Sequence, residues 1–163
     1  MENKDIMMNT RRIMQLHRWH ITTRLKDLES VHDAQQHLLF YVVNNPGCTQ
    51  KEIADFFALS KAAVTKSVKR MLNSELIVRH VNDMDERKYA LYATEKGERL
   101  FKEFIHIIRD VDAMALQDFS DEQRKVLGEC LEKIMNNLET DYSRGQNMHR
   151  LLAEAEEGKT ETK

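Results

Sequence analysis

The sequence contains few of the residues that tight turns and cross-links require. Its 163 residues include 5 Gly, 1 Pro and 2 Cys. A β-sandwich or barrel needs many more turn residues, so the composition argues against those folds. Cys48 and Cys130 lie far apart and no CxxC motif occurs, which excludes a disulfide framework and a cysteine-ligated zinc site. We expect one mainly helical domain with a C-terminal appendage.

Long apolar runs and the common enzyme motifs are also missing. No run approaches the roughly 18 apolar residues of a membrane span, and the first residues lack the apolar region of a signal peptide. We therefore expect a cytoplasmic protein with no membrane contact. The sequence holds no glycine-rich phosphate loop, no GxSxG and no HExxH motif. It thus predicts a binding protein, with no enzymatic activity, cofactor or metal.

Charge is abundant but unevenly distributed. Charged residues make up 32% of the chain and hydrophobic residues 41%, with a formal net charge of −2. Residues 51–102 carry 11 basic and 8 acidic groups, whereas residues 103–163 carry 8 basic and 14 acidic groups. A charged run is usually a solvated helix face, so its meaning depends on the motif that contains it.

Apolar periodicity predicts a series of helices whose starts coincide with capping residues. Capping boxes begin at Thr49 and Ser120, and Ser60 and Thr94 are further N-cap residues. The predicted helices cover residues 5–29 and 33–44, a short segment from the Thr49 cap through Phe57, a segment from the Ser60 cap to about Asn73, residues 95 to about 117, and residues 120–142. A weaker amphipathic pattern from Met148 predicts one more helix, followed by a disordered tail at 158–163.

Residues 77–92 change from helical periodicity to β-branched and aromatic residues. Residues 77–81 and 88–92 predict the two strands of a hairpin, and the polar segment 82–87 predicts a projecting loop between them. The two short helices before the hairpin form a helix-turn-helix pattern, joined by residues 57–60. This order predicts a winged helix-turn-helix fold, mainly α with a small β-hairpin.

The second short helix carries an outward face suited to DNA. Residues 60–70 contain four basic groups and no acidic one. A recognition helix must enter the major groove, where lysines neutralise phosphates and small side chains permit close approach. An alternative is a winged-helix interaction module whose basic helix docks an acidic partner protein. The candidate contacts on this helix are Ser60, Lys61, Ala62, Thr65, Lys66, Lys69 and Arg70.

The chain resembles the MarR family of winged-helix transcription regulators over residues 33–101. The matching stretches are 47–54, 60–65, Asp85-Glu-Arg87 and Thr94-Glu-Lys-Gly97. The resemblance implies that Arg87 at the wing tip enters the minor groove, that Asp85 orients it, and that Lys88 adds a further DNA contact. The sequence departs from the family pattern at Ala58 and Glu75, where the family usually has glycine, and at Ala93, which replaces leucine.

The resemblance also implies a homodimer that binds a palindromic operator as a repressor. The long terminal helices would interlock, so residues 5–32 and 103–142 form the dimerisation helices and 33–102 the DNA-binding lobe. Residues 1–142 are one unit, and 143–163 are a C-terminal helical extension and tail. Alternatively, the apolar residues of these terminal helices pack into the core of a monomer. The interface candidates are Ile6, Ile13, Leu127, Leu131, Ile134 and Leu138.

Members of the family commonly bind a small anionic or aromatic effector between the dimer region and the DNA-binding lobe. Ordinary packing of rings at helix seams is the alternative, and it is the better-supported interpretation of each candidate residue. His37 falls where zinc-sensing members place a ligand, but the remaining ligand set is absent. Cys48 is interpreted as a buried hydrophobe rather than a redox sensor. The effector candidates are Arg12, His17, His20, His37 and Tyr41.

Overall fold

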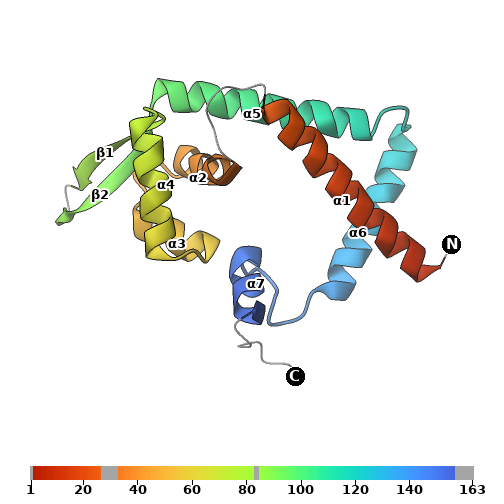
Figure 1. Cartoon of the computed structure of the whole chain (residues 1–163). Helices are drawn as coiled ribbons and strands as arrows, with labels where there is room; N and C mark the ends of the chain where they lie inside the picture. Colours follow the sequence, from red (N-terminus) through yellow and green to blue (C-terminus); the bar gives the residue numbers. More distant parts are fainter. Residues whose placement is uncertain (1, 27–32, 83–84, 157–163) are drawn as a thin grey trace.

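The computed structural model describes residues 2–26, 33–82 and 85–156 and has the predicted mainly helical fold with one hairpin (Figure 1). The winged lobe consists of α2, α3, α4 and the antiparallel strands β1 and β2; α1, α5 and α6 extend away from it (Figure 1). The elements are α1 (Asn3–Leu25), α2 (Asp33–Asn44), α3 (Gln50–Phe57), α4 (Lys61–Asn73), β1 (Ile77–Asn82), β2 (Asp85–Ala93), α5 (Glu95–Ala115), α6 (Asp121–Leu138) and α7 (Met148–Glu156).

The predicted helix starts are confirmed. The side chains of Thr49, Ser60, Thr94 and Ser120 each accept a hydrogen bond from the backbone amide three residues later. The two capping boxes are complete, because Glu52 and Gln123 accept from the N-cap amides at 2.7 and 2.9 Å. Four of the helices therefore begin where local sequence alone positions them.

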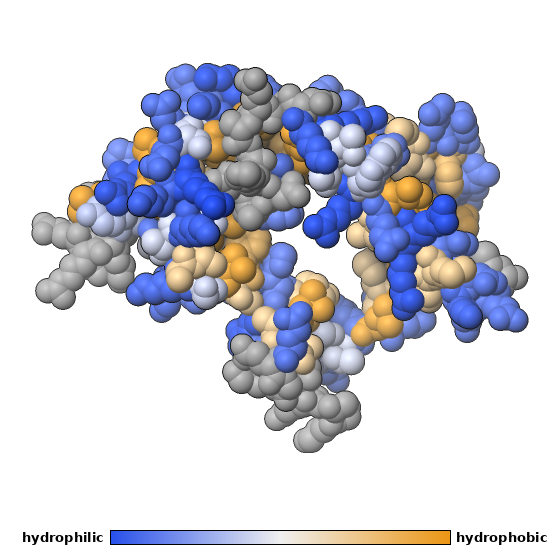
Figure 2. All heavy atoms as spheres, in the orientation of Figure 1, coloured by the Kyte–Doolittle hydropathy of each residue, from blue (hydrophilic) through white to orange (hydrophobic). Residues whose placement is uncertain are grey.

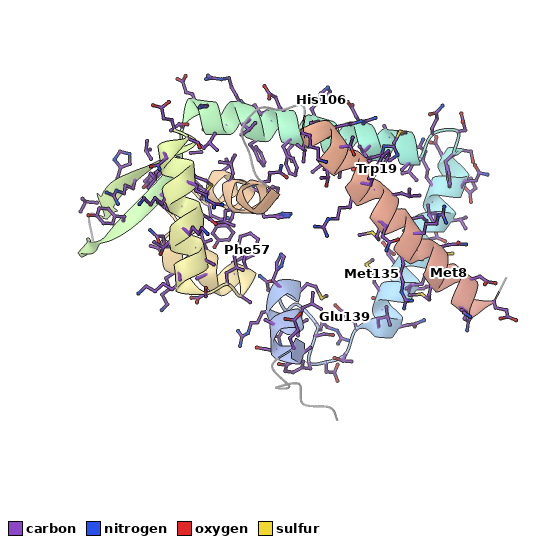
Figure 3. All side chains as sticks on the ribbon, in the orientation of Figure 1. Met8, Trp19, Phe57, His106, Met135 and Glu139 are labelled. Atoms are coloured by element: carbon purple, nitrogen blue, oxygen red, sulfur yellow. The ribbon has the colours of Figure 1, made fainter. Side chains whose placement is uncertain are left out.

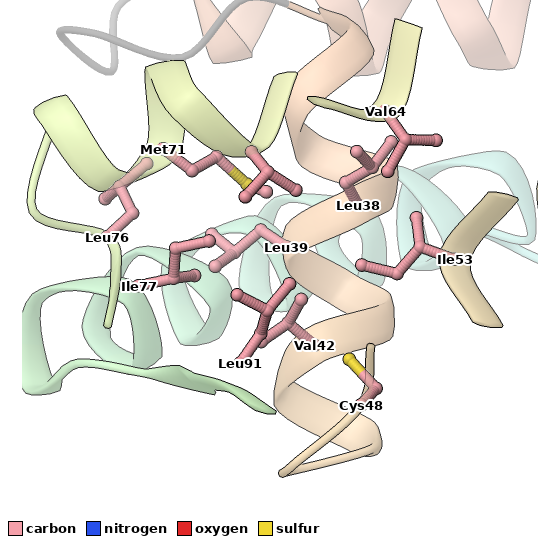
Figure 4. Packing of buried hydrophobic residues seen from close by; sticks show 11 residues of the cluster. Leu38, Leu39, Val42, Cys48, Ile53, Val64, Met71, Leu76, Ile77 and Leu91 are labelled. Atoms are coloured by element: carbon pink, nitrogen blue, oxygen red, sulfur yellow. The ribbon is translucent and has the colours of Figure 1, made fainter. Parts of the chain in front are cut away.

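The core lies inside the winged lobe, where α2, α3, α4 and the hairpin meet (Figure 4). The stripe predicted for α4 is buried at Val64, Val68 and Met71, and Ile53 of α3 faces it. Cys48 belongs to this core. Its backbone also pairs with Leu91, which adds a short bridge beside β2 that the sequence did not predict. The core holds α3 and α4 in a fixed relation to the hairpin.

The prediction of a projecting loop over residues 82–87 was wrong. β1 extends to Asn82 and β2 begins at Asp85, with an irregularity in register between Val81 and Asn82. Polar composition suggested a loop, but strand pairing depends on backbone hydrogen bonds, which polar residue types do not prevent. The two strands of the wing are therefore longer than predicted.

Two of the departures from the family pattern fall at left-handed backbone. Ala58 has φ 51° and Glu75 has φ 57°, a region that favours glycine. Glu75 ends the turn after α4, where the Leu76 amide donates to the Met71 carbonyl at 2.9 Å. Its own carbonyl accepts from the Thr94 hydroxyl at 2.6 Å. The turn is thus retained without glycine because neighbouring hydrogen bonds fix it.

The terminal helices form an open frame beside the lobe (Figure 1). α1 lies against α5, where His17 Nε2 is 2.8 Å from Asp112 Oδ1. The last helix, α7, returns to the winged lobe and packs against α3. α1 begins at Asn3 and ends at Leu25, whereas its end was predicted at residue 29. Residues 27–32 and the predicted tail at 158–163 lie outside the described residues. No described helix has the length and apolar content needed to cross a membrane.

Candidate nucleic-acid interface

The outward face of α4 is exposed along its whole length. Val64, Val68 and Met71 turn the opposite face into the core, which fixes how the helix is rotated. None of the four cations forms an ion pair within the described residues. The exposed positions are Lys61, Ala62, Ala63, Thr65, Lys66, Lys69 and Arg70. The predicted contact face is therefore a single positively charged surface, free of carboxylates.

The beginning of α4 is held by two side chains. Ser60 Oγ accepts from the Ala63 amide at 3.2 Å, so this hydroxyl acts as a helix cap. Thr65 Oγ1 lies 2.8 Å from the Lys61 carbonyl and 3.0 Å from Gln50 Oε1 on α3. Gln50 was not among the predicted site residues. Its position directly after the Thr49 cap was the only sequence signal, and nothing in the sequence connects it to Thr65.

The hairpin adds a second exposed surface beside α4. Arg79 lies over the ring of Tyr89, with its guanidinium carbon 4.8 Å from the centroid, and His80 contacts Tyr92 edge-on. These pairs depend on strand register and were not predicted. The predicted wing residues Asp85, Arg87 and Lys88 all lie in the first half of β2, at the tip of the ribbon. Their side chains lie outside the described part of the chain.

The five predicted effector residues have different surroundings. His17 is bonded to Asp112, and His20 contacts Trp19 on its own helix. Tyr41 packs against Phe56 and Phe57 of α3 with centroids 4.7 and 5.9 Å apart. No described contact joins two of the five: Arg12, His17, His20, His37 and Tyr41. Burial raises the pKa of Tyr41, and the nearby Cys48 and Glu52 raise it further.

Side chains capable of binding a metal do not gather in the described residues. No group of three or more His, Cys, Asp or Glu side chains is close enough to hold an ion there. Burial raises the pKa of the Cys48 thiol to about 11, and the charge of Glu52 acts in the same direction. The hydrogen bonds from the Thr49 amide and hydroxyl lower the pKa of Glu52. Cys48 is thus a buried neutral thiol.

Apolar side chains are exposed on α1 and α6. No residue of α6 is buried, and Leu25 is the one buried residue of α1. Apolar patches lie among hydrophilic residues on this side of the molecule (Figure 2). The exposed apolar side chains include Met8, Trp19 and Met135, which are labelled in Figure 3. Of the interface candidates, Ile134 is half-buried and Ile6, Ile13, Leu127, Leu131 and Leu138 are exposed.

The fold and the basic surface together define a winged helix-turn-helix protein. A model of the MarR family matches residues 30–88. The chain is 28% identical over 98 residues to the HTH-type transcriptional regulator BilQ of Clostridium symbiosum, which covers 60% of this chain and 68% of that protein. It is 24% identical over 124 residues to the transcriptional regulator HosA of Escherichia coli, covering 76% and 92% of the two chains. Over these segments the chain is similar to transcriptional regulators of the MarR family.

Solved structures have the same fold. A MepR variant of S. aureus bound to an oligodeoxyribonucleotide aligns with a TM-score of 0.66 at 22% identity, over 82% of this chain and 98% of that one. A SlyA-like regulator from Listeria monocytogenes aligns with a TM-score of 0.61 at 20% identity, over 100% and 99%. These structures show that the chain has the winged-helix fold of MarR-type regulators, and the relatives named above are transcriptional regulators.

Proposed function

We propose that this chain is a dimeric, non-enzymatic repressor that binds a palindromic operator in double-stranded DNA. The observation that carries the proposal is the outward face of α4, which presents four cations and no carboxylate beside the hairpin, with no ion pair to any of the four cations among the residues that the structure describes. A surface of this kind has the electrostatics for phosphate binding and the shape for the major groove. The MepR variant bound to an oligodeoxyribonucleotide supports it.

Each part of the surface has a separate role in this proposal. Lys66 and Lys69 neutralise phosphates, while Ala62 lets the helix approach the bases closely. Ser60, Lys61 and Arg70 lie at the two ends of the exposed face and add backbone contacts. At the wing tip Arg87 enters the minor groove, Asp85 orients it, and Lys88 contacts a phosphate. A guanidinium fits the negative potential of a narrow A/T-rich groove.

Two copies are needed because one winged lobe reads only a few base pairs. Residues 5–32 and 103–142 would form the dimer, with residues 33–102 as the DNA-binding lobe and 143–163 as an extension. The exposed apolar side chains of α1 and α6 support this division, since monomers rarely leave such a large surface uncovered. Occupying a promoter would then block transcription in the cytoplasm.

A small anionic or aromatic effector would adjust the spacing of the two lobes. Arg12, His17, His20, His37 and Tyr41 lie on α1 and α2, which flank the junction of the lobe with the dimer helices. The contact of His17 with Asp112 on α5 supports a role at this junction, because it links α1 to the helix that leaves the lobe.

The test is fluorescence anisotropy on duplexes selected from a randomised pool, over a series of salt concentrations. We expect steep salt dependence for the parent protein. Lys66→Ala and Lys69→Ala should each weaken binding to all duplexes and reduce the salt slope by about one. Arg87→Ala should lose the preference for A/T-rich flanks. Lys102→Ala on α5, outside both the proposed DNA surface and the dimer helices, is the matched control and should bind like the parent.

The outcome also separates DNA binding from the other use of a basic helix. If the parent selects no duplex even at low salt, or if the triple variant at Lys66, Lys69 and Arg87 binds as well as the parent, the DNA proposal is wrong. The basic surface would then be assigned to binding an acidic protein partner, as in a winged-helix interaction module.

A further inference from the structure

The hydroxyl of Thr65 is turned back into the protein. Thr65 is exposed on α4, and its Oγ1 lies 2.8 Å from the Lys61 carbonyl one turn earlier and 3.0 Å from Gln50 Oε1. Threonine in a helix divides between two rotamers, and a bond to the preceding turn selects one of them. Contacts from both α3 and α4 therefore fix this side chain.

The hydrogen bonds leave little capacity for a base. A hydroxyl has one hydrogen and donates it to one acceptor. If the Gln50 carboxamide turns over, its NH₂ donates to Thr65 Oγ1 while the hydroxyl donates to the Lys61 carbonyl, and both groups are satisfied inside the protein. A hydrogen bond from Oγ1 to DNA would break one of these contacts. The Thr65 methyl makes no such bond and is free to contact a ligand.

We infer that Thr65 recognises a thymine through its methyl group, and that Gln50 is a positioning residue that holds the hydroxyl away from the base. This inference rests on the proposed function, since it needs α4 in the major groove. There the thymine C5-methyl is the one apolar group on the base edges, and a threonine methyl is a suitable partner for it. The pair Gln50–Thr65 would thus determine specificity without a polar base contact.

The experiment replaces each thymine of a selected duplex, one at a time, by deoxyuridine, which removes only the 5-methyl group. For the parent protein we expect one replacement per half-site to raise Kd about fourfold, the effect of exposing one methyl group. Thr65→Ser keeps the hydroxyl and should reduce this ratio to near one. Thr65→Val keeps a methyl and should retain it. Lys66→Ala is the control: it should weaken binding to both duplexes and leave the ratio unchanged.

The role of Gln50 is tested by the same ratio. Gln50→Ala should lower the thymine-to-deoxyuridine ratio, and Gln50→Glu should lower it as well, because a carboxylate cannot donate a hydrogen bond to Thr65 Oγ1. A purely structural role would weaken binding to both duplexes equally. If no replacement weakens binding by the parent, or if Thr65→Ser discriminates as the parent does, the inference is wrong. Failure to select any duplex would instead overturn the proposed function, and this inference with it.

Discussion

At the residue scale, Gly97 occupies a position that no side chain can share. A Cβ there would lie 2.1 Å from the Leu76 carbonyl oxygen. The same turn holds the Gly97 amide against the Thr94 hydroxyl at 3.1 Å, so α5 cannot shift away without losing its cap. We expect Gly97→Ala to lower the free energy of unfolding by about 2 kcal/mol. Urea denaturation measures this free energy. Lys102→Ala, at an exposed position on the same helix, is the control and should stay within about 0.5 kcal/mol of the parent.

The two cysteines should differ sharply in reactivity. Cys48 is 6% exposed and its thiol pKa is raised to about 11, whereas Cys130 on α6 is exposed. The thiolate is the reactive form, and a raised pKa leaves less of it at any pH below that value. At pH 8 iodoacetamide should therefore modify Cys130 in the native protein and Cys48 only after unfolding. Mass spectrometry after timed alkylation measures both sites, and fast native modification of Cys48 would contradict the prediction.

At the element scale, the sequence predicted the helices well where a local signal marks their ends. Thr49, Ser60, Thr94 and Ser120 act within three residues of themselves, so their effect is visible without the fold. The hairpin was predicted in place but not in length. Here the polar tip favoured a loop, while the cross-strand hydrogen bonds that extend β2 to Asp85 depend on pairing.

The docking of α7 on α3 could not be predicted, because it joins residues 91 positions apart in the chain. Asn147 Nδ2 donates to the Phe56 carbonyl at 2.7 Å, and His149 packs on Phe57 with ring centroids 5.1 Å apart. Within the connecting segment, Tyr142 donates to Glu154 at 2.6 Å, which ties the start of this segment to α7. α7 therefore returns to the winged lobe as a braced element.

Releasing this contact should expose α7 to proteolysis. We expect Asn147→Ala to accelerate trypsin cleavage after Arg150, because the loss of the bond to the Phe56 carbonyl lets α7 leave α3 more often. Met148→Ala is the control, since Met148 is 62% exposed and is not a partner in this bond. Peptide mapping over a time course gives both rates. Equal rates in the two variants would show that the hydrogen bond does not hold α7.

At the scale of the whole molecule, apolar periodicity identified the stripes on the terminal helices but not their arrangement. Ile13 and Leu131 were predicted to lie in a dimer interface or in a monomeric core, and periodicity fits both. In the structure they are 60% and 43% exposed, so they do not close a core within one chain. The candidate site shows the same limit: the basic face of α4 was predictable from spacing, whereas the partners of Thr65 and His17 come from other helices.

The oligomeric state is the prediction that belongs to this scale. If the exposed faces of α1 and α6 form a two-fold interface, a charge placed in its middle has to be buried unpaired, at a cost of several kcal/mol in each copy. We therefore expect the parent to sediment as a dimer and Leu131→Asp to sediment as a monomer at the same concentration. Val81→Asp is the matched control, because Val81 is 53% exposed on the wing, outside the proposed interface. A dimer that survives Leu131→Asp, or a parent that sediments as a monomer, would place the interface elsewhere or remove it. If the parent is a monomer, a protein dimer would no longer determine the spacing of two half-sites in the operator.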